Sequence, residues 1–116
     1  MNTKRIIIHS AEEEFRALIK ALIASEQLAI VEAKSREQLV RLCCEGGFDK
    51  VVTNDVRMFM NGSISVNEIR RKRSTRIFIL STDHSEHAIL SLLELGVAQF
   101  LSLPIDIDRL HKKLSE

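Results

Sequence analysis

The sequence has no apolar run close to the ~20 residues that a transmembrane helix needs. The run behind Lys4 and Arg5 covers only residues 6–8, which is too short for the apolar core of a signal peptide. An excess of one charge is also lacking, because 17 Lys and Arg stand against 16 Asp and Glu, for a net charge of +1. The whole molecule therefore has no electrostatic bias toward nucleic acid or membrane, and we expect a cytoplasmic protein.

Proline and cysteine are scarce. A single proline, together with 45% hydrophobic and 28% charged residues, is typical of a folded domain and not of a disordered tail. The 116 residues suffice for one core, so we expect one domain over residues 1–116. Cys43 and Cys44 are adjacent within a helical pattern, where neighbouring side chains diverge by about 100°. We expect reduced thiols in the core and no structural disulfide.

Catalytic motifs are missing as well. No Ser/His/Asp or Cys/His arrangement can be assembled from the spacings, and we expect no enzymatic activity. The pair Gly46-Gly47 follows a helical segment, whereas phosphate-binding loops follow a strand. The basic run at residues 70–73 has no interleaved aromatics for base stacking. It suits the C-terminal end of a helix better than a nucleic-acid contact.

What the sequence does contain is a regular alternation of two hydrophobic periods. Short β-branched runs predict strands at residues 6–9, 28–33, 50–53, 76–81 and 99–102. Helical spacing predicts helices over residues 12–25, 35–46, 65–72, 86–95 and 106–114. The second of these begins with a capping box at Ser35 and ends at Gly46. Asp83 or Ser85 is expected to cap the fourth, and Asp106 the fifth. Residues 54–62 are expected to form a loop. Five strands alternating with five helices predict a doubly wound α/β fold with a parallel sheet.

In the flavodoxin-like strand order 2-1-3-4-5, a ligand crevice lies at the carboxyl ends of the first and third strands. In this chain the crevice would lie between two groups of residues. These are His9, Ser10 and Ala11 on one side and Thr53, Asn54 and Asp55 on the other.

Several segments at consistent spacings carry a family resemblance. They are Lys4-Arg5-Ile6-Ile7-Ile8, Phe15-Arg16-Ala17-Leu18-Ile19-Lys20, Phe48-Asp49-Lys50-Val51-Val52, Met60-Asn61-Gly62, Ile77-Phe78-Ile79-Leu80-Ser81, Leu93-Glu94-Leu95-Gly96-Val97 and Phe100-Leu101-Ser102-Leu103-Pro104. Together they span nearly the whole chain. The sequence resembles a response-regulator receiver domain, which implies the flavodoxin-like (βα)5 fold and a role in two-component signalling.

The resemblance also implies a phosphorylation pocket, and here that pocket departs from the family pattern. Where the family has two acids that hold Mg²⁺, this chain has Ser10 and Ala11. Asn54 stands at the position of the phospho-accepting Asp, and Leu103 at that of the Lys before the proline. Only the hydroxyl at the end of the fourth strand is kept, as Ser81.

These replacements remove the charges that phosphoryl transfer requires. A neutral Asn carboxamide is not the anionic nucleophile that attacks a phosphoryl group. Mg²⁺ prefers carboxylate and phosphate oxygens, so we expect its binding to be lost or weak and no other cofactor to replace it. We therefore interpret the chain as an atypical receiver that acts by phosphorylation-independent protein–protein contact or dimerisation. It either stands alone or forms the N-terminal part of a longer regulator.

The helix predicted over residues 86–95 has apolar residues around most of its circumference, more than one buried face needs. Either the helix is deeply buried, or its outer face pairs with a second chain. By resemblance, this helix forms the output face with the fifth strand and the last helix, and Phe100 is the aromatic that moves on activation. We expect a protein partner or a second copy to bind there, on a surface containing Phe100, Leu90, Leu92 and Leu95. Nucleic acid would be reached only through an output domain absent from this chain.

A phosphorylatable receiver with Asp55 as a shifted acceptor is one alternative. Strand side chains alternate in direction, so Asp55 does not automatically take the place of its neighbour Asn54 in the pocket. A role at the start of a loop or as a helix cap is the competing interpretation. Glu12 would supply one Mg²⁺ ligand, or would serve the helix N-terminus with the two acids that follow it.

A small-ligand or metal-binding module is the second alternative. His9, His84 and His87 fall near the same end of the sheet, and three imidazoles can bind Zn²⁺. The competing interpretation is two solvated histidines beside a helix cap and a hydrogen-bonded His9 at the end of a buried strand.

Overall fold

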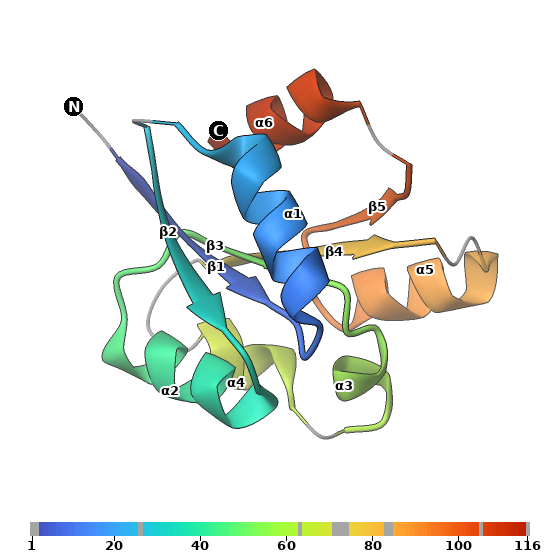
Figure 1. The fold of residues 1–116 in the computed structure, drawn as a ribbon. Helices are drawn as coiled ribbons and strands as arrows, with labels where there is room; N and C mark the ends of the chain where they lie inside the picture. The colour runs from blue at the N-terminus through green and yellow to red at the C-terminus, as the bar shows by residue number, and fades with distance from the viewer. Residues whose placement is uncertain are drawn as a thin grey trace.

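The computed structural model describes residues 3–25, 27–62, 64–70, 75–82, 85–104 and 106–115, apart from the side chains of Asn67 and Arg70. Its elements are β1 (Lys4–His9), α1 (Glu13–Ile23), β2 (Leu28–Ala33), α2 (Arg36–Glu45), β3 (Lys50–Thr53), α3 (Arg57–Met60), α4 (Val66–Arg70), β4 (Arg76–Ser81), α5 (Glu86–Glu94), β5 (Gln99–Ser102) and α6 (Ile107–Ser115). The strands form one parallel sheet in the order β2-β1-β3-β4-β5 (Figure 1). The predicted fold class and strand order are confirmed.

Helices cover both faces of the sheet. One core layer joins the sheet to α2, α3, α4 and α5, and the other joins it to α1 and α6 (Figure 1). Side chains of β1 alternate between the layers, with Ile7 in the first and Ile6 and Ile8 in the second. Because both faces are covered, the central strands read as continuous apolar runs instead of alternating patterns.

The helix ends follow the predicted caps. The Ser35 hydroxyl accepts the backbone N–H of Gln38 at 3.1 Å, and Ser85 and Asp106 cap α5 and α6 in the same way. Asp83, the alternative cap, lies outside the described residues. None of the described helices is long and apolar enough to cross a bilayer.

The segment after β3 differs from the loop predicted over residues 54–62, because it contains the helical turn α3. Two features stabilise this turn. The Asp55 side chain accepts the N–H of Met58, and the side chains of Met58 and Phe59 are buried in the core. The predicted helix over 65–72 corresponds to α4, and its last two residues lie outside the described part of the chain.

The two cysteines differ in their surroundings. Neither is part of a disulfide, as predicted, but only Cys43 is buried, and burial raises the pKa of its thiol to about 11. Cys44 is exposed, so the expectation of two core thiols is wrong for this residue. Adjacent helical side chains point in different directions, and only one of them faces the core.

Lys50 is a buried cation that the sequence pattern did not reveal. Its ammonium donates to the backbone carbonyls of Lys113 at 3.0 Å and Leu114 at 2.7 Å. It also lies 5.8 Å from the ring centre of Phe78. The last carbonyls of a helix have no partner within the helix, so Lys50 satisfies two of them and ties α6 to β3.

We predict that Lys50→Met destabilises the domain by about 2 kcal/mol, because two charge-assisted hydrogen bonds to buried carbonyls are lost. Urea unfolding followed by circular dichroism measures the change. Lys112→Met, at an exposed position in the last turn of α6, is the matched control and is expected to have little effect. Equal stabilities of the two variants would contradict the role given to Lys50.

Candidate functional site

The carboxyl ends of β1 and β3 meet at one edge of the sheet, where His9 is paired in register with Thr53. The chain then leaves the sheet through Ser10 on one side and Asn54 on the other. The crevice residues predicted from the strand order are therefore brought together as expected.

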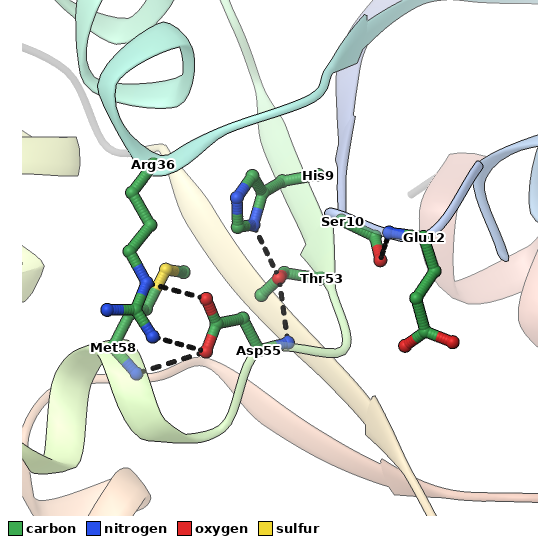
Figure 2. Close-up of polar contacts among 7 residues, drawn as sticks. All are labelled: His9, Ser10, Glu12, Arg36, Thr53, Asp55 and Met58. Atoms are coloured by element: carbon green, nitrogen blue, oxygen red, sulfur yellow. Dashed lines mark hydrogen bonds and ion pairs between the residues drawn. The ribbon is translucent and has the colours of Figure 1, made fainter.

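The loop after β1 is held by groups of its own chain (Figure 2). Ser10 is buried, and its hydroxyl accepts the N–H of Glu12 at 3.0 Å. The Ser10 carbonyl accepts a hydrogen bond of 2.7 Å from the Arg16 guanidinium, which also pairs with Glu32 at 3.2 Å. Ala11 is exposed and contributes no polar side-chain atom. The two positions that correspond to the family's acid pair thus offer one hydroxyl, which is already engaged.

Asn54 and Glu12 bridge the crevice. The Asn54 amide donates to a carboxylate oxygen of Glu12 at 3.1 Å. Glu12 stands at the N-cap of α1 but makes no side-chain cap there. The sequence offered two interpretations of Glu12, as a Mg²⁺ ligand or as a group that serves the helix N-terminus. The structure instead shows its carboxylate accepting a hydrogen bond from the opposite loop.

Asp55 is fully engaged by other groups. Its carboxylate forms a bidentate pair with Arg36, at 2.8 Å to Nε and 3.0 Å to Nη2, and it also accepts the N–H of Met58 at 3.2 Å (Figure 2). Burial acts to raise the pKa of Asp55, but the hydrogen bonds and charge of Arg36, helped by Met58, outweigh burial and lower it. The carboxylate thus stays ionised and acts as the cap of α3.

His9 is only 2% exposed, and its Nδ1 lies 2.8 Å from the Thr53 hydroxyl. Burial is the largest cause that lowers its pKa from the ordinary 6.5. His87 is exposed on α5, and His84 lies outside the described residues. Within the described ranges, no three His, Cys, Asp or Glu side chains form a group that could hold a metal ion.

Ser81 and Leu103 come from neighbouring strand ends. The Leu103 N–H donates to the Ser81 carbonyl at 2.8 Å, and the peptide bond from Leu103 to Pro104 is cis. The Leu103 side chain is partly buried against the core layer that contains α1 and α6. Phe100 is half-buried against the opposite core layer.

The exposed residues of α5 include the leucines Leu90 and Leu93 beside the polar Glu86, His87 and Glu94. Leu90 is 52% exposed, and Leu95, the residue directly after α5, is 48% exposed. Leu92 is 0% exposed, so its placement on the predicted output surface is wrong. It lies one turn after the buried Ala88 and therefore shares the core-facing side of the helix.

Comparisons with known proteins agree with this architecture. A Thermotoga maritima response regulator is 18% identical with a TM-score of 0.76, and the match covers 96% of this chain and 93% of that one. A Burkholderia pseudomallei pilus assembly-related protein is 17% identical with a TM-score of 0.81, covering 97% and 87%. A response regulator from the same organism, solved with a phosphorylated aspartic acid, is 14% identical with a TM-score of 0.74, covering 96% of this chain but 66% of that one. No curated protein matches the sequence significantly.

The five-stranded parallel sheet covered by helices on both faces defines a doubly wound α/β domain. The match to the response regulator receiver domain family extends over residues 6–115. The chain belongs to this family.

We predict that Asn54→Asp destabilises the domain at neutral pH, by roughly 0.5 kcal/mol at this exposed site, because the new carboxylate faces that of Glu12. The neighbouring negative charge raises the pKa of the new carboxylate, so the loss relative to wild type should shrink as this carboxylate becomes protonated. Urea unfolding at about pH 7 and about pH 4.5 measures the difference. Asn54→Ala loses the hydrogen bond to the Glu12 carboxylate without adding a charge, so its deficit at about pH 7 should be smaller than that of Asn54→Asp. An Asn54→Asp variant that behaves like Asn54→Ala at both pH values would contradict the prediction.

Proposed function

We propose that this receiver domain signals by contact with a protein partner, without an aspartyl phosphate and without Mg²⁺. The observation that carries the proposal is the hydrogen bond between Asn54 and Glu12 across the crevice. By resemblance a neutral amide stands at the acceptor position, and the carboxylate of Glu12 is already its partner. The polar groups of the two loops thus hydrogen-bond to each other, at the place where a phosphorylatable receiver needs an anionic nucleophile and a metal ion.

The state of Asp55 also supports the proposal. To attack a phosphoryl group, its carboxylate would have to leave the bidentate pair with Arg36 and uncap α3. Breaking a partly buried charged pair leaves the guanidinium without its partner, which opposes such a step. Neither Ser10 nor Ala11 supplies an anionic metal ligand to assist it.

The partner surface that we propose is the outer side of α5. Leu90 is exposed there. Leu95, the residue after α5, is also exposed and borders a hollow of roughly 270 Å³ whose lining includes Phe59, Ile64 and Val66 together with Ser65. Exposed leucines next to an apolar hollow are typical of protein contacts in which a large side chain enters a pocket. A second copy of the chain or another protein with such an anchor fits this surface.

The direct test is an amide NMR titration with Mg²⁺ and beryllofluoride, which mimics a bound phosphoryl group. We expect no significant shift of Asn54, Ser81 or Phe100 in the wild type. The positive control is a variant with the family's charges restored, namely Ser10→Asp, Ala11→Asp, Asn54→Asp and Leu103→Lys together. Large shifts around Asn54 in the wild type would reject phosphorylation-independent signalling.

For the α5 surface we predict self-association at high micromolar concentration, seen as a sedimentation mass above that of the monomer. Leu90→Glu should restore the monomer, because a charge cannot be buried unpaired in an apolar contact. Leu18→Glu, at a similarly exposed leucine on α1, is the matched control and should leave the association intact. A monomeric wild type would reject the second copy as partner, and equal effects of the two variants would reject α5 as the surface.

A further inference from the structure

A buried histidine connects the two sides of the crevice. His9 at the end of β1 contacts the hydroxyl of Thr53 at the end of β3, at 2.8 Å (Figure 2). Thr53 is fully buried, so neither partner of this contact can exchange it freely for water. A buried polar pair of this kind keeps its hydrogen bond only while its protons are correctly placed.

The hydrogen bonds of Thr53 define the proton positions. Its oxygen accepts the N–H of Asp55 at 3.0 Å, and the His9 ring is its other partner among the described residues. We assign the hydroxyl proton to the contact with His9 Nδ1, which accepts it in the neutral tautomer that carries its proton on Nε2. A proton on Nδ1 would turn the contact around and leave the buried hydroxyl proton of Thr53 without an acceptor.

Three charged groups act on the imidazole from the surrounding elements. Arg16 on α1 and Arg36 on α2 disfavour a charged ring, whereas Asp55 in the loop before α3 favours it. The neighbour of His9 on β2 is Ala33, which carries no charge. Asp55 is thus the single acid among these groups, and it is shared between the ring and Arg36.

Asp55 also connects the ring to the output side of the domain. Its carboxylate holds Arg36 and caps α3 through the N–H of Met58. The turn α3 lies against α5, on which the exposed Leu95 is part of the proposed partner surface (Figure 1). A change at His9 therefore has a path of direct contacts to α5, by way of Thr53, Asp55 and α3.

We propose that His9 is a proton-operated switch, in which a proton takes the place of the phosphoryl group as the input of this receiver. A proton from solvent binds Nδ1, reverses the contact with Thr53, and sets the imidazolium in competition with Arg36 for the Asp55 carboxylate. The cap of α3 loosens, and the adjoining surface of α5 changes. The output at α5 rests on the proposed function, whereas the titration and its effect on α3 do not.

The direction with pH follows from the burial of the ring. Burial lowers the pKa of His9 in the folded state below the ordinary 6.5, so the folded state prefers the neutral ring. The stabilisation is complete above the unfolded pKa of 6.5 and is lost as pH falls through the interval between the unfolded and folded values. The switch therefore responds to acidification.

The test is an NMR titration from about pH 8 to about pH 4.5 that follows the His9 ring and the amides of Met58 and Leu95. We expect all three to move with one midpoint below 6.5, the ordinary value for histidine. Asp55→Asn should lower this midpoint because it removes the favourable charge, and Arg36→Gln should raise it because it removes a repulsive one.

His9→Gln should abolish the transition at Met58, whereas His87→Gln, at an exposed histidine on α5, should leave it unchanged. A His9 ring that titrates while Met58 and Leu95 stay still would overturn the proposal, and so would midpoints that move in the same direction in both charge variants. If His9→Gln does not fold, the titration of the Met58 and Leu95 amides in Asp55→Asn and Arg36→Gln still tests whether they follow the His9 ring. Amide shifts on addition of beryllofluoride, together with an unchanged His9 transition, would reject the proposed function but not the proton switch.

Discussion

The central constraint in this domain is that β1 and β3 are buried on both faces and end side by side in polar residues. Water reaches neither His9 nor Thr53, so the groups at these strand ends have to find partners within the chain. They do so through short contacts that reach both loops: His9 to Thr53, Thr53 to the N–H of Asp55, and Asn54 to Glu12. The geometry of the crevice follows from this requirement.

The same requirement links the crevice to the helices around it. Asp55 would be a costly charge next to a buried histidine unless a cation offset it, and Arg36 from α2 supplies that cation. In the loop after β1, the guanidinium of Arg16 from α1 donates a hydrogen bond to the carbonyl of Ser10. The sheet edge, α1, α2 and α3 are therefore connected through one set of polar contacts. In our account this set occupies the place of the metal and phosphoryl chemistry implied by the family resemblance.

Periodicity predicted most of the fold because the signals are local. The strands, their order and the caps at Ser35, Ser85 and Asp106 each depend on residues close in sequence. The turn α3 was missed because it depends on the ion pair of Asp55 with Arg36, which is distant along the chain. Lys50 was missed for the same reason, since its partners are carbonyls at the end of α6.

Within the site, the sequence indicated which residues meet but not how they satisfy one another. By the family resemblance, residues other than the expected acid pair, acceptor and lysine could be assigned to those positions one by one, whereas the hydrogen bond from Asn54 to Glu12 could not be predicted from the sequence. Because α5 has leucines at many neighbouring positions, the sequence did not show which of them face the core and which face solvent. Leu92 was therefore assigned to the surface although it belongs to the core.

The central claim is that this crevice neither binds nor transfers a phosphoryl group. Incubation with acetyl phosphate and Mg²⁺, followed at once by intact-mass spectrometry under mild acid conditions, tests it most directly. A phosphorylatable receiver treated in parallel shows that the conditions preserve an acyl phosphate. The account predicts an unchanged mass for this chain. A gain of one phosphoryl group that disappears in Asp55→Asn would contradict it.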